Sequence, residues 1–148
     1  MRIVLQRVKR AAVRVGDEVV SAIDRGLVVF VGVTHQDDAS DVEYLANKIA
    51  QSRIFEDAAG KFNLSALDTQ ASVLVVPQFT LYASTRRGRR PDFAAAAPPE
   101  QAEPLVNALI DHIAAQGLRV ERGVFRTKML VEIHNDGPVT IWIDSKER

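Results

Sequence analysis

The chain has 148 residues, and its 47% hydrophobic and 26% charged residues are typical of one globular domain, 1–148, rather than of a disordered or fibrous chain. Its 19 basic and 19 acidic side chains cancel, which excludes a polycation that binds nucleic acid indiscriminately. Because the sequence has no cysteine, no secretory signal pattern and no apolar run of ~18 residues, disulfides, thiolate metal sites and membrane spans are excluded and a cytoplasmic location is expected.

Apolar runs predict strands in the first half of the chain. An apolar stretch begins at residues 3–5, Val13 and Val15 alternate with Arg14 before the turn-forming pair Gly16-Asp17, and apolar residues resume at 19–20, which together predict early strands with a hairpin. The uninterrupted runs 27–33 and 72–76 are typical of strands that are buried on both faces. The second run ends at Pro77, which cannot donate to a sheet ladder, so the segment after it is expected at a strand end.

Two segments have the periodicity of helices. Residues 40–51 place apolar side chains on one helical face, and Ser40 with Glu43 fits a capping box at the start. Residues 98–116 do the same up to a glycine stop, with Pro104 expected to kink or delay the first turn.

The chain returns to strand patterns at 118–122, 128–134 and 139–143, which brings the expected total to about eight strands and two main helices. Strands that come in blocks, rather than in regular alternation with helices, favour an α+β fold. We therefore expect a single domain with a barrel-like, mainly antiparallel sheet and two main helices.

The common catalytic signatures are absent from the sequence. There is no H-E-x-x-H, no G-x-S-x-G and no Walker-type glycine loop. His35, His112 and His134 are scattered with no spacing typical of metal ligands, so neither a metal site nor a cofactor is predicted.

The segment Gln78-Phe79-Thr80 follows a buried strand, a position where backbone amides aimed at one point form an oxyanion hole. A Gln and a Thr in such a place also complete local hydrogen bonds, and that alternative stays open. Another alternative makes Thr80 the nucleophile of a small-ester hydrolase with His134 as its base. It requires the two side chains to lie within hydrogen-bond reach.

Two loops complete the candidate site. Residues 135–140 contain an X-Pro bond, which adopts the cis form at small cost, and an ordinary hairpin turn is the alternative. Between Tyr82 and Phe93, guanidinium groups offer the fork geometry that phosphates favour, although a solvated loop explains them equally. These arginines are Arg86, Arg87, Arg89 and Arg90.

Three motifs, PQFTLYA at 77–83, RRGRRPDF at 86–93 and NDGPVTIW at 135–142, together resemble the D-aminoacyl-tRNA deacylase family in its bacterial and eukaryotic form. The resemblance extends from LQRV at 5–8 through RIFED at 53–57 to the last strand, with the motifs in family order. It implies the family's fold and hydrolysis of the ester bond of D-aminoacyl-tRNA and of glycyl-tRNA. It also implies a cytoplasmic homodimer whose partner is aminoacyl-tRNA, with no DNA or membrane partner.

The resemblance further implies an active site built from two subunits. Catalysis falls to residues 78–80 of one subunit, and substrate binding falls to four residues of the other: Gly137, Pro138, Val139 and Thr140. The Gly-Pro bond is expected to be cis, with its carbonyls toward the substrate's α-amino group. Arg7 is expected to hold this loop and Phe125 to stack on the terminal adenine. An L side chain then meets the Gly-Pro backbone, whereas a D side chain points outward.

The sequence departs from the family pattern at two places. Pro77 stands where the family usually has Ser, which removes a hydroxyl and an amide donor. Small residues usually follow the Phe at 125, where this chain has Arg126 and, two positions on, Lys128, which offer further phosphate contacts. The competing hypothesis is a non-catalytic RNA-binding module, in which the arginine loop and its aromatic neighbours bind RNA without cleaving an ester.

Overall fold

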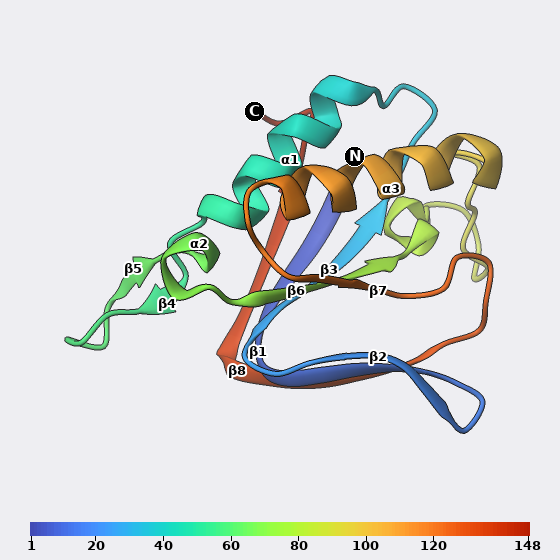
Figure 1. The fold of residues 1–148 in the computed structure, drawn as a ribbon. Coiled ribbons are helices and arrows are strands. Elements are labelled where there is room, and N and C mark those ends of the chain that lie inside the picture. Colours follow the sequence, from blue (N-terminus) through green and yellow to red (C-terminus); the bar gives the residue numbers. More distant parts are fainter.

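The computed structural model describes residues 1–148, in which a curled six-stranded sheet has helices packed on one face and β4 and β5 form a separate two-stranded sheet (Figure 1). The elements are β1 (Arg2–Val15), β2 (Glu18–Ile23), β3 (Gly26–Gly32), α1 (Ala39–Gln51), β4 (Phe55–Glu56), β5 (Phe62–Leu64), α2 (Ala66–Thr69), β6 (Ser72–Pro77), the 3₁₀ helix η1 (Phe79–Tyr82), α3 (Pro99–Ala115), β7 (Val120–Arg122) and β8 (Leu130–Asp144). The two main helices are confirmed as α1 and α3, and α2 is a single turn. The number of strands agrees with the expected total of about eight, but β4 and β5 were not predicted, and the strands expected at 128–134 and 139–143 form one strand, β8. None of the helices has both the length and the apolar composition of a membrane-spanning helix.

β1 organises the sheet. It pairs antiparallel with β3 over residues 2–8, with β2 over residues 11–15, and with β8 over residues 2–14. β6 then lies parallel to β3, and β7 lies parallel to β6. The predicted barrel-like α+β fold is confirmed, and the two parallel pairings make its sheet a mixed one.

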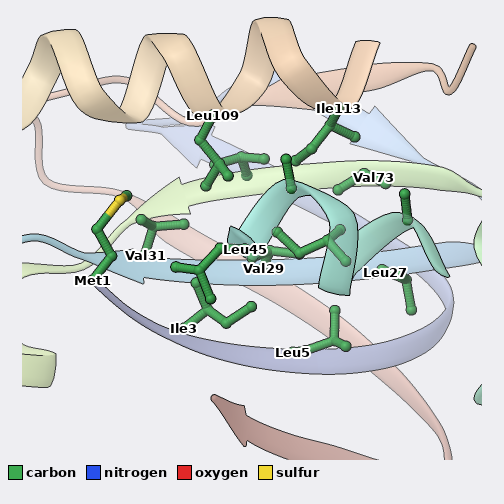
Figure 2. Close-up of a cluster of buried hydrophobic side chains, with 14 of the residues drawn as sticks. Met1, Ile3, Leu5, Leu27, Val29, Val31, Leu45, Val73, Leu109 and Ile113 are labelled. Atoms are coloured by element: carbon green, nitrogen blue, oxygen red, sulfur yellow. The ribbon is translucent and has the colours of Figure 1, made fainter. Parts of the chain in front are cut away.

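The larger apolar core fills the space between the helices and the sheet (Figure 2). It gathers 24 buried residues, including Leu45 of α1, Leu109 of α3 and Leu5 of β1. In β3, Val29 belongs to this core, while its neighbour Val28 faces the other side and joins a second core of seven residues. Burial on both faces, predicted from the uninterrupted apolar run, is therefore confirmed for β3.

The start of α1 differs from the prediction. Its N-cap is Asp38, whose carboxylate accepts a hydrogen bond from the Ser40 amide at 2.8 Å, and the Asp41 carboxylate accepts one from the Asp38 amide at 3.0 Å. The predicted capping box of Ser40 and Glu43 is wrong, because two such patterns overlap here and only the Asp41 side chain is buried. Pro104 does not delay α3, which begins before it.

The C-terminal strands also pair differently from the prediction. The segments 128–134 and 139–143 were expected as separate strands, with a hairpin turn between them as one alternative. Both instead lie end to end within β8 and pair with β1, where Ile133 is opposite Ala11 and Ile141 is opposite Leu5. The hairpin alternative is wrong, and residues 136–139 form a bulge in a continuous strand.

A buried ionic cluster joins α1 to both ends of the described chain. The fully buried Asp41 carboxylate accepts hydrogen bonds from Lys146 at 2.7 Å and Arg148 at 3.2 Å, and the Met1 amino group pairs with Asp37 at 2.5 Å. Burial by itself raises the pKa of a carboxyl group, but the hydrogen bond from Lys146 and others from its surroundings hold the pKa of Asp41 well below its ordinary value.

We predict that Asp41→Asn lowers the free energy of unfolding by about 1–3 kcal/mol at pH 7, because the substitution keeps the shape of the side chain but removes the charge that its partners require. Urea denaturation measures this loss. The matched control is Asp111→Asn on the exposed face of α3, which we expect to leave stability unchanged. An equal loss in both variants would contradict a special role for Asp41.

Comparing wild type with Asp41→Asn at different pH values gives a second test. Because folding lowers the pKa of Asp41, its stabilisation is complete above the ordinary carboxyl pKa of about 3.9 and is lost as the pH falls through the folded-state value. The stability difference between wild type and Asp41→Asn should be constant above about pH 5 and shrink below about pH 4. A stability difference that grows on acidification would contradict a lowered pKa of Asp41 in the folded state.

Candidate active site

An open, mainly apolar cavity of about 650 Å³ lies where the parallel strands β3 and β6 end. Val31 and Pro77, which are paired neighbours on these strands, line it together with Ala102 and Val106 of α3. Its polar contributors include Gln78. An apolar hollow with a few polar groups at the carboxyl ends of parallel strands is the usual place for a small ligand.

η1 carries the predicted catalytic segment to the rim of this cavity. The backbone amide of Gln78 donates to the Val31 carbonyl at 2.7 Å, and the Gln78 side chain donates to the Thr80 hydroxyl. Phe79 is 58% exposed, and its ring meets Phe93 edge-on at 5.0 Å between centroids. The amides of Phe79 and Thr80 donate to no acceptor in the chain, as expected at the start of a helix. Local hydrogen bonds therefore occupy the two polar side chains and leave two amides free.

The loop between β7 and β8 brings Phe125 to the same cavity. At the start of the loop, the Gly123 amide donates to the Val75 carbonyl at 2.8 Å, and within it the Thr127 hydroxyl donates to the Phe125 carbonyl at 3.2 Å. Phe125 is partly buried and lines the cavity together with Phe79. The structure thus brings the segment predicted to be catalytic and the residue predicted to bind adenine to one cavity.

The Gly137–Pro138 peptide bond is cis, as predicted, and both residues are exposed in the bulge of β8. The backbone of Gly137 has a φ of 132°, a value that essentially only glycine adopts. A Cβ atom there would lie 2.8 Å from the Val139 side chain and 3.2 Å from the Arg7 guanidinium. The Asn135 side chain closes the bulge by accepting from the Val139 amide at 2.8 Å. The loop is thereby held in one shape from both sides.

Arg7 is the buried cation beneath this loop, at 4% exposure. Its guanidinium donates to the Asp136 carbonyl at 3.0 Å and to the Ile54 carbonyl at 2.8 Å, and it pairs with Glu56 at 3.3 Å. Arg7 thus contacts the residue before Gly137, where the resemblance places it. Sequence reasoning missed Glu56 as a functional partner, although the RIFED motif that contains it was the available signal.

Within one chain, the Gly-Pro loop does not reach the cavity, whose lining includes neither Gly137 nor Pro138. Arg2 marks the end of β1 near η1 through its hydrogen bond to the Leu81 carbonyl, whereas Arg7 marks the position of the loop. Arg7 lies five positions along β1 from Arg2. Each chain therefore carries the two predicted half-sites on separate parts of its surface.

The proposed pairing of Thr80 with His134 is wrong within the chain. His134 lies opposite Arg10 on β8 and makes no hydrogen bond with Thr80. The Thr80 hydroxyl has the Gln78 side chain as its partner instead. The chain also contains no group of three or more His, Cys, Asp or Glu side chains that could hold a metal ion.

The arginine loop stands beside the cavity. Two backbone hydrogen bonds between Ser84 and Asp92, at 2.7 and 2.8 Å, close its base, and the following residue is the Phe93 that contacts Phe79. Its four exposed arginines take part in none of the chain's ion pairs. Tyr82 is buried beneath the Arg2 guanidinium, so it is not free to stack on a base as the RNA-binding hypothesis required.

Comparison with known proteins identifies relatives along the whole chain. The family model described as D-Tyr-tRNA(Tyr) deacylase matches residues 4–144. A D-aminoacyl-tRNA deacylase of Chloroflexus aurantiacus is 58% identical over 99% of this chain and 92% of its own length. The enzyme of the same name from Thermomicrobium roseum is 54% identical over 99% of this chain and 96% of its own length.

Solved structures agree with this relationship. The structure titled c-Myc DNA Unwinding Element Binding Protein has a TM-score of 0.91 and 41% identity, covering 97% of this chain and 98% of its own. A probable eukaryotic D-amino acid tRNA deacylase, at 18% identity, shares the fold with a TM-score of 0.83, covering 96% of this chain and 97% of its own. By its sequence and its fold, the chain belongs to the D-aminoacyl-tRNA deacylase family of hydrolases.

Proposed function

We propose that this protein is a cytoplasmic homodimer that hydrolyses the ester of D-aminoacyl-tRNA, and that of glycyl-tRNA, to release the amino acid and the tRNA. The observation that carries the proposal is the cavity flanked by residues 78–80 and Phe125, in a chain more than half identical to deacylases of that name. The Gly-Pro loop, which is exposed and lies outside the lining of the cavity of its own chain, is proposed to complete the cavity of the partner subunit.

The chemistry follows from the groups at the rim. The terminal adenine occupies the cavity against Phe125, which places the 3′ ester near η1. Water, assisted by the 2′-hydroxyl of the terminal ribose, attacks the ester carbonyl, and the amides of Phe79 and Thr80 stabilise the oxyanion. The bond to the ribose oxygen then breaks, and that oxygen leaves as the hydroxyl of the tRNA. Because the ester is already activated, positioning replaces a strong protein nucleophile.

Chiral selection is assigned to the partner's loop. The carbonyls of Gly137 and Pro138 receive the α-amino group, so the amino and ester groups are both fixed. An L side chain then points into the Gly-Pro backbone, which the contacts of Arg7 and Asn135 prevent from moving aside. A D side chain points toward solvent, and glycine has no side chain to exclude.

The first test compares D-tyrosyl-, L-tyrosyl- and glycyl-tRNA as substrates, in EDTA and against the spontaneous hydrolysis rate. We expect rapid loss of the D and glycyl esters, with the L ester at the spontaneous rate. Equal cleavage of the L ester would refute the assignment of chirality to the Gly-Pro loop. Retention of tRNA on the protein without any cleavage would instead support the nucleic-acid-binding alternative. That alternative draws on the unpaired arginines and on the name of one solved relative, which describes DNA binding.

We expect Gly137→Ala to lower the rate on D-tyrosyl-tRNA by about 10- to 100-fold, because the new Cβ displaces Val139 or Arg7 and misplaces the amino-binding carbonyls. Single-turnover kinetics measure the effect. The control is Gly16→Ala, where φ is 60° and a Cβ meets nothing within 4 Å, so it also places an alanine at positive φ but without the clash. Similar losses of rate in both variants would show that the clash at Gly137 has no effect on catalysis.

The role of Thr80 is tested by Thr80→Val, which keeps the size of the side chain and the backbone amide. Because the proposal assigns stabilisation to the amide, kcat should fall less than about tenfold, whereas loss of a true nucleophile costs about 10⁴-fold or more. Steady-state hydrolysis of D-tyrosyl-tRNA distinguishes the two. A collapse of kcat with an unchanged melting temperature would restore Thr80 as the nucleophile.

A further inference from the structure

Arg126 has an unusual backbone conformation. It and Gln70 are the only residues other than glycine with positive φ, at 57° and 51°. Gln70 is explained locally, because it ends α2 in the left-handed conformation common at helix C-termini. Arg126 caps no helix, and left-handed residues with a Cβ tend to be kept where the side chain has a function.

The surroundings of Arg126 direct it to the cavity. It lies between Phe125 and Thr127, and all three residues line the cavity. The Thr127 hydroxyl donates to the Phe125 carbonyl at 3.2 Å, and the Val124 amide contacts the Met129 sulfur at 3.2 Å. The neighbours of Arg126 therefore fix the turn, and its own side chain is not needed to close it.

The guanidinium of Arg126 is also uncompensated. It takes part in none of the ten ion pairs of the chain and in no hydrogen bond to another side chain or to the backbone. The arginine loop, likewise unpaired, lies at the same end of the molecule (Figure 1). A mainly apolar hollow beside a free, planar cation fits a ligand that joins an aromatic ring to a phosphate.

We infer that Arg126 is a positioning residue that binds the 5′-phosphate of the terminal nucleoside whose base occupies the cavity. The inference rests on the proposed function, which places the base against Phe125 and the 3′ ester at residues 78–80. The 5′-phosphate of such a nucleoside leaves the ribose away from the ester, so its contact with Arg126 anchors the nucleotide without touching the reacting atoms. The contact strengthens binding and leaves the chemical step unchanged.

The test uses two small substrates that differ only in this phosphate: 3′-O-D-tyrosyl-adenosine and its 5′-monophosphate. For the wild-type dimer, we expect the phosphate to lower KM about tenfold at low salt with little change in kcat, toward the lower end of what a hydrogen bond to a charged group contributes. In Arg126→Gly, the advantage should disappear. Glycine suits a φ of 57°, so the melting temperature should be unchanged or higher, which separates a binding defect from misfolding.

Two further variants sharpen the result. Arg126→Lys retains a cation and should recover part of the phosphate advantage, whereas Arg122→Gln, which removes an exposed cation at the end of β7 outside the cavity lining, should keep all of it. An advantage that survives in Arg126→Gly, or that is absent from the wild type, overturns the inference while the proposed function stands. If the wild type hydrolyses neither small substrate and does not hydrolyse D-tyrosyl-tRNA, both the inference and the proposed function are overturned.

Discussion

The pairing of β1 with β8 along nearly its whole length is the constraint on which the rest of the structure depends. Alternate residues of β1, such as Ile3 and Leu5, are buried in the main core, so a slip of one residue would turn them toward the opposite face. The register of β8 is fixed on both sides of its bulge, where Ile133 faces Ala11 and Ile141 faces Leu5. Core packing, rather than any contact of its own, thus determines where the Gly-Pro loop emerges.

The buried cation Arg7 then holds the backbone of the Gly-Pro loop in one conformation. Arg7 points from β1 into a site from which water is largely excluded, and a buried guanidinium is stable only when acceptors surround it. The carbonyls of Ile54 and Asp136 and the carboxylate of Glu56 meet that requirement. Because these acceptors come from the β4 region and from the bulge of β8, satisfying one side chain ties the bulge to the body of the domain. The loop is exposed, yet its backbone is held from beneath.

Local patterns predicted the elements of this fold well and their pairing less well. Uninterrupted apolar runs correctly indicated burial on both faces of β3, because that pattern depends only on what each residue contacts above and below the sheet. The pattern strand, turn, strand around residues 135–140 is the same whether the strands pair with each other or with a third strand. Only the long-range pairing with β1 decides, and it excludes the hairpin. The start of α1 was misplaced for a similar reason, since burial of Asp41 selects between two overlapping caps.

Some features of the candidate site could also be predicted from the sequence, whereas others became visible only in the structure. Convergence of Phe79 and Phe125 on one cavity was expected from the resemblance and not from periodicity, because 46 residues of chain separate the two positions. The left-handed conformation of Arg126 had no local signal, since glycine is the residue that usually marks such a turn. Sequence reasoning placed Arg7 at the loop, but Glu56 and the clamp made by Asn135 became visible only once the strands were paired.

The proposed selection by backbone groups accounts for the number of contacts that serve one short loop. A pocket made of side chains recognises the size and polarity of its ligand, so it admits some D-amino acids and rejects others. Fixed carbonyls and a fixed Gly-Pro backbone sense only the direction in which the side chain leaves the α-carbon, and they therefore treat all D-amino acids alike. Such a device fails if the backbone yields by even an ångström. Rigidity supplied by Arg7 from below and by Asn135 from within the bulge is what this mode of selection requires, and a loop so held is suited to enter the cavity of a second subunit.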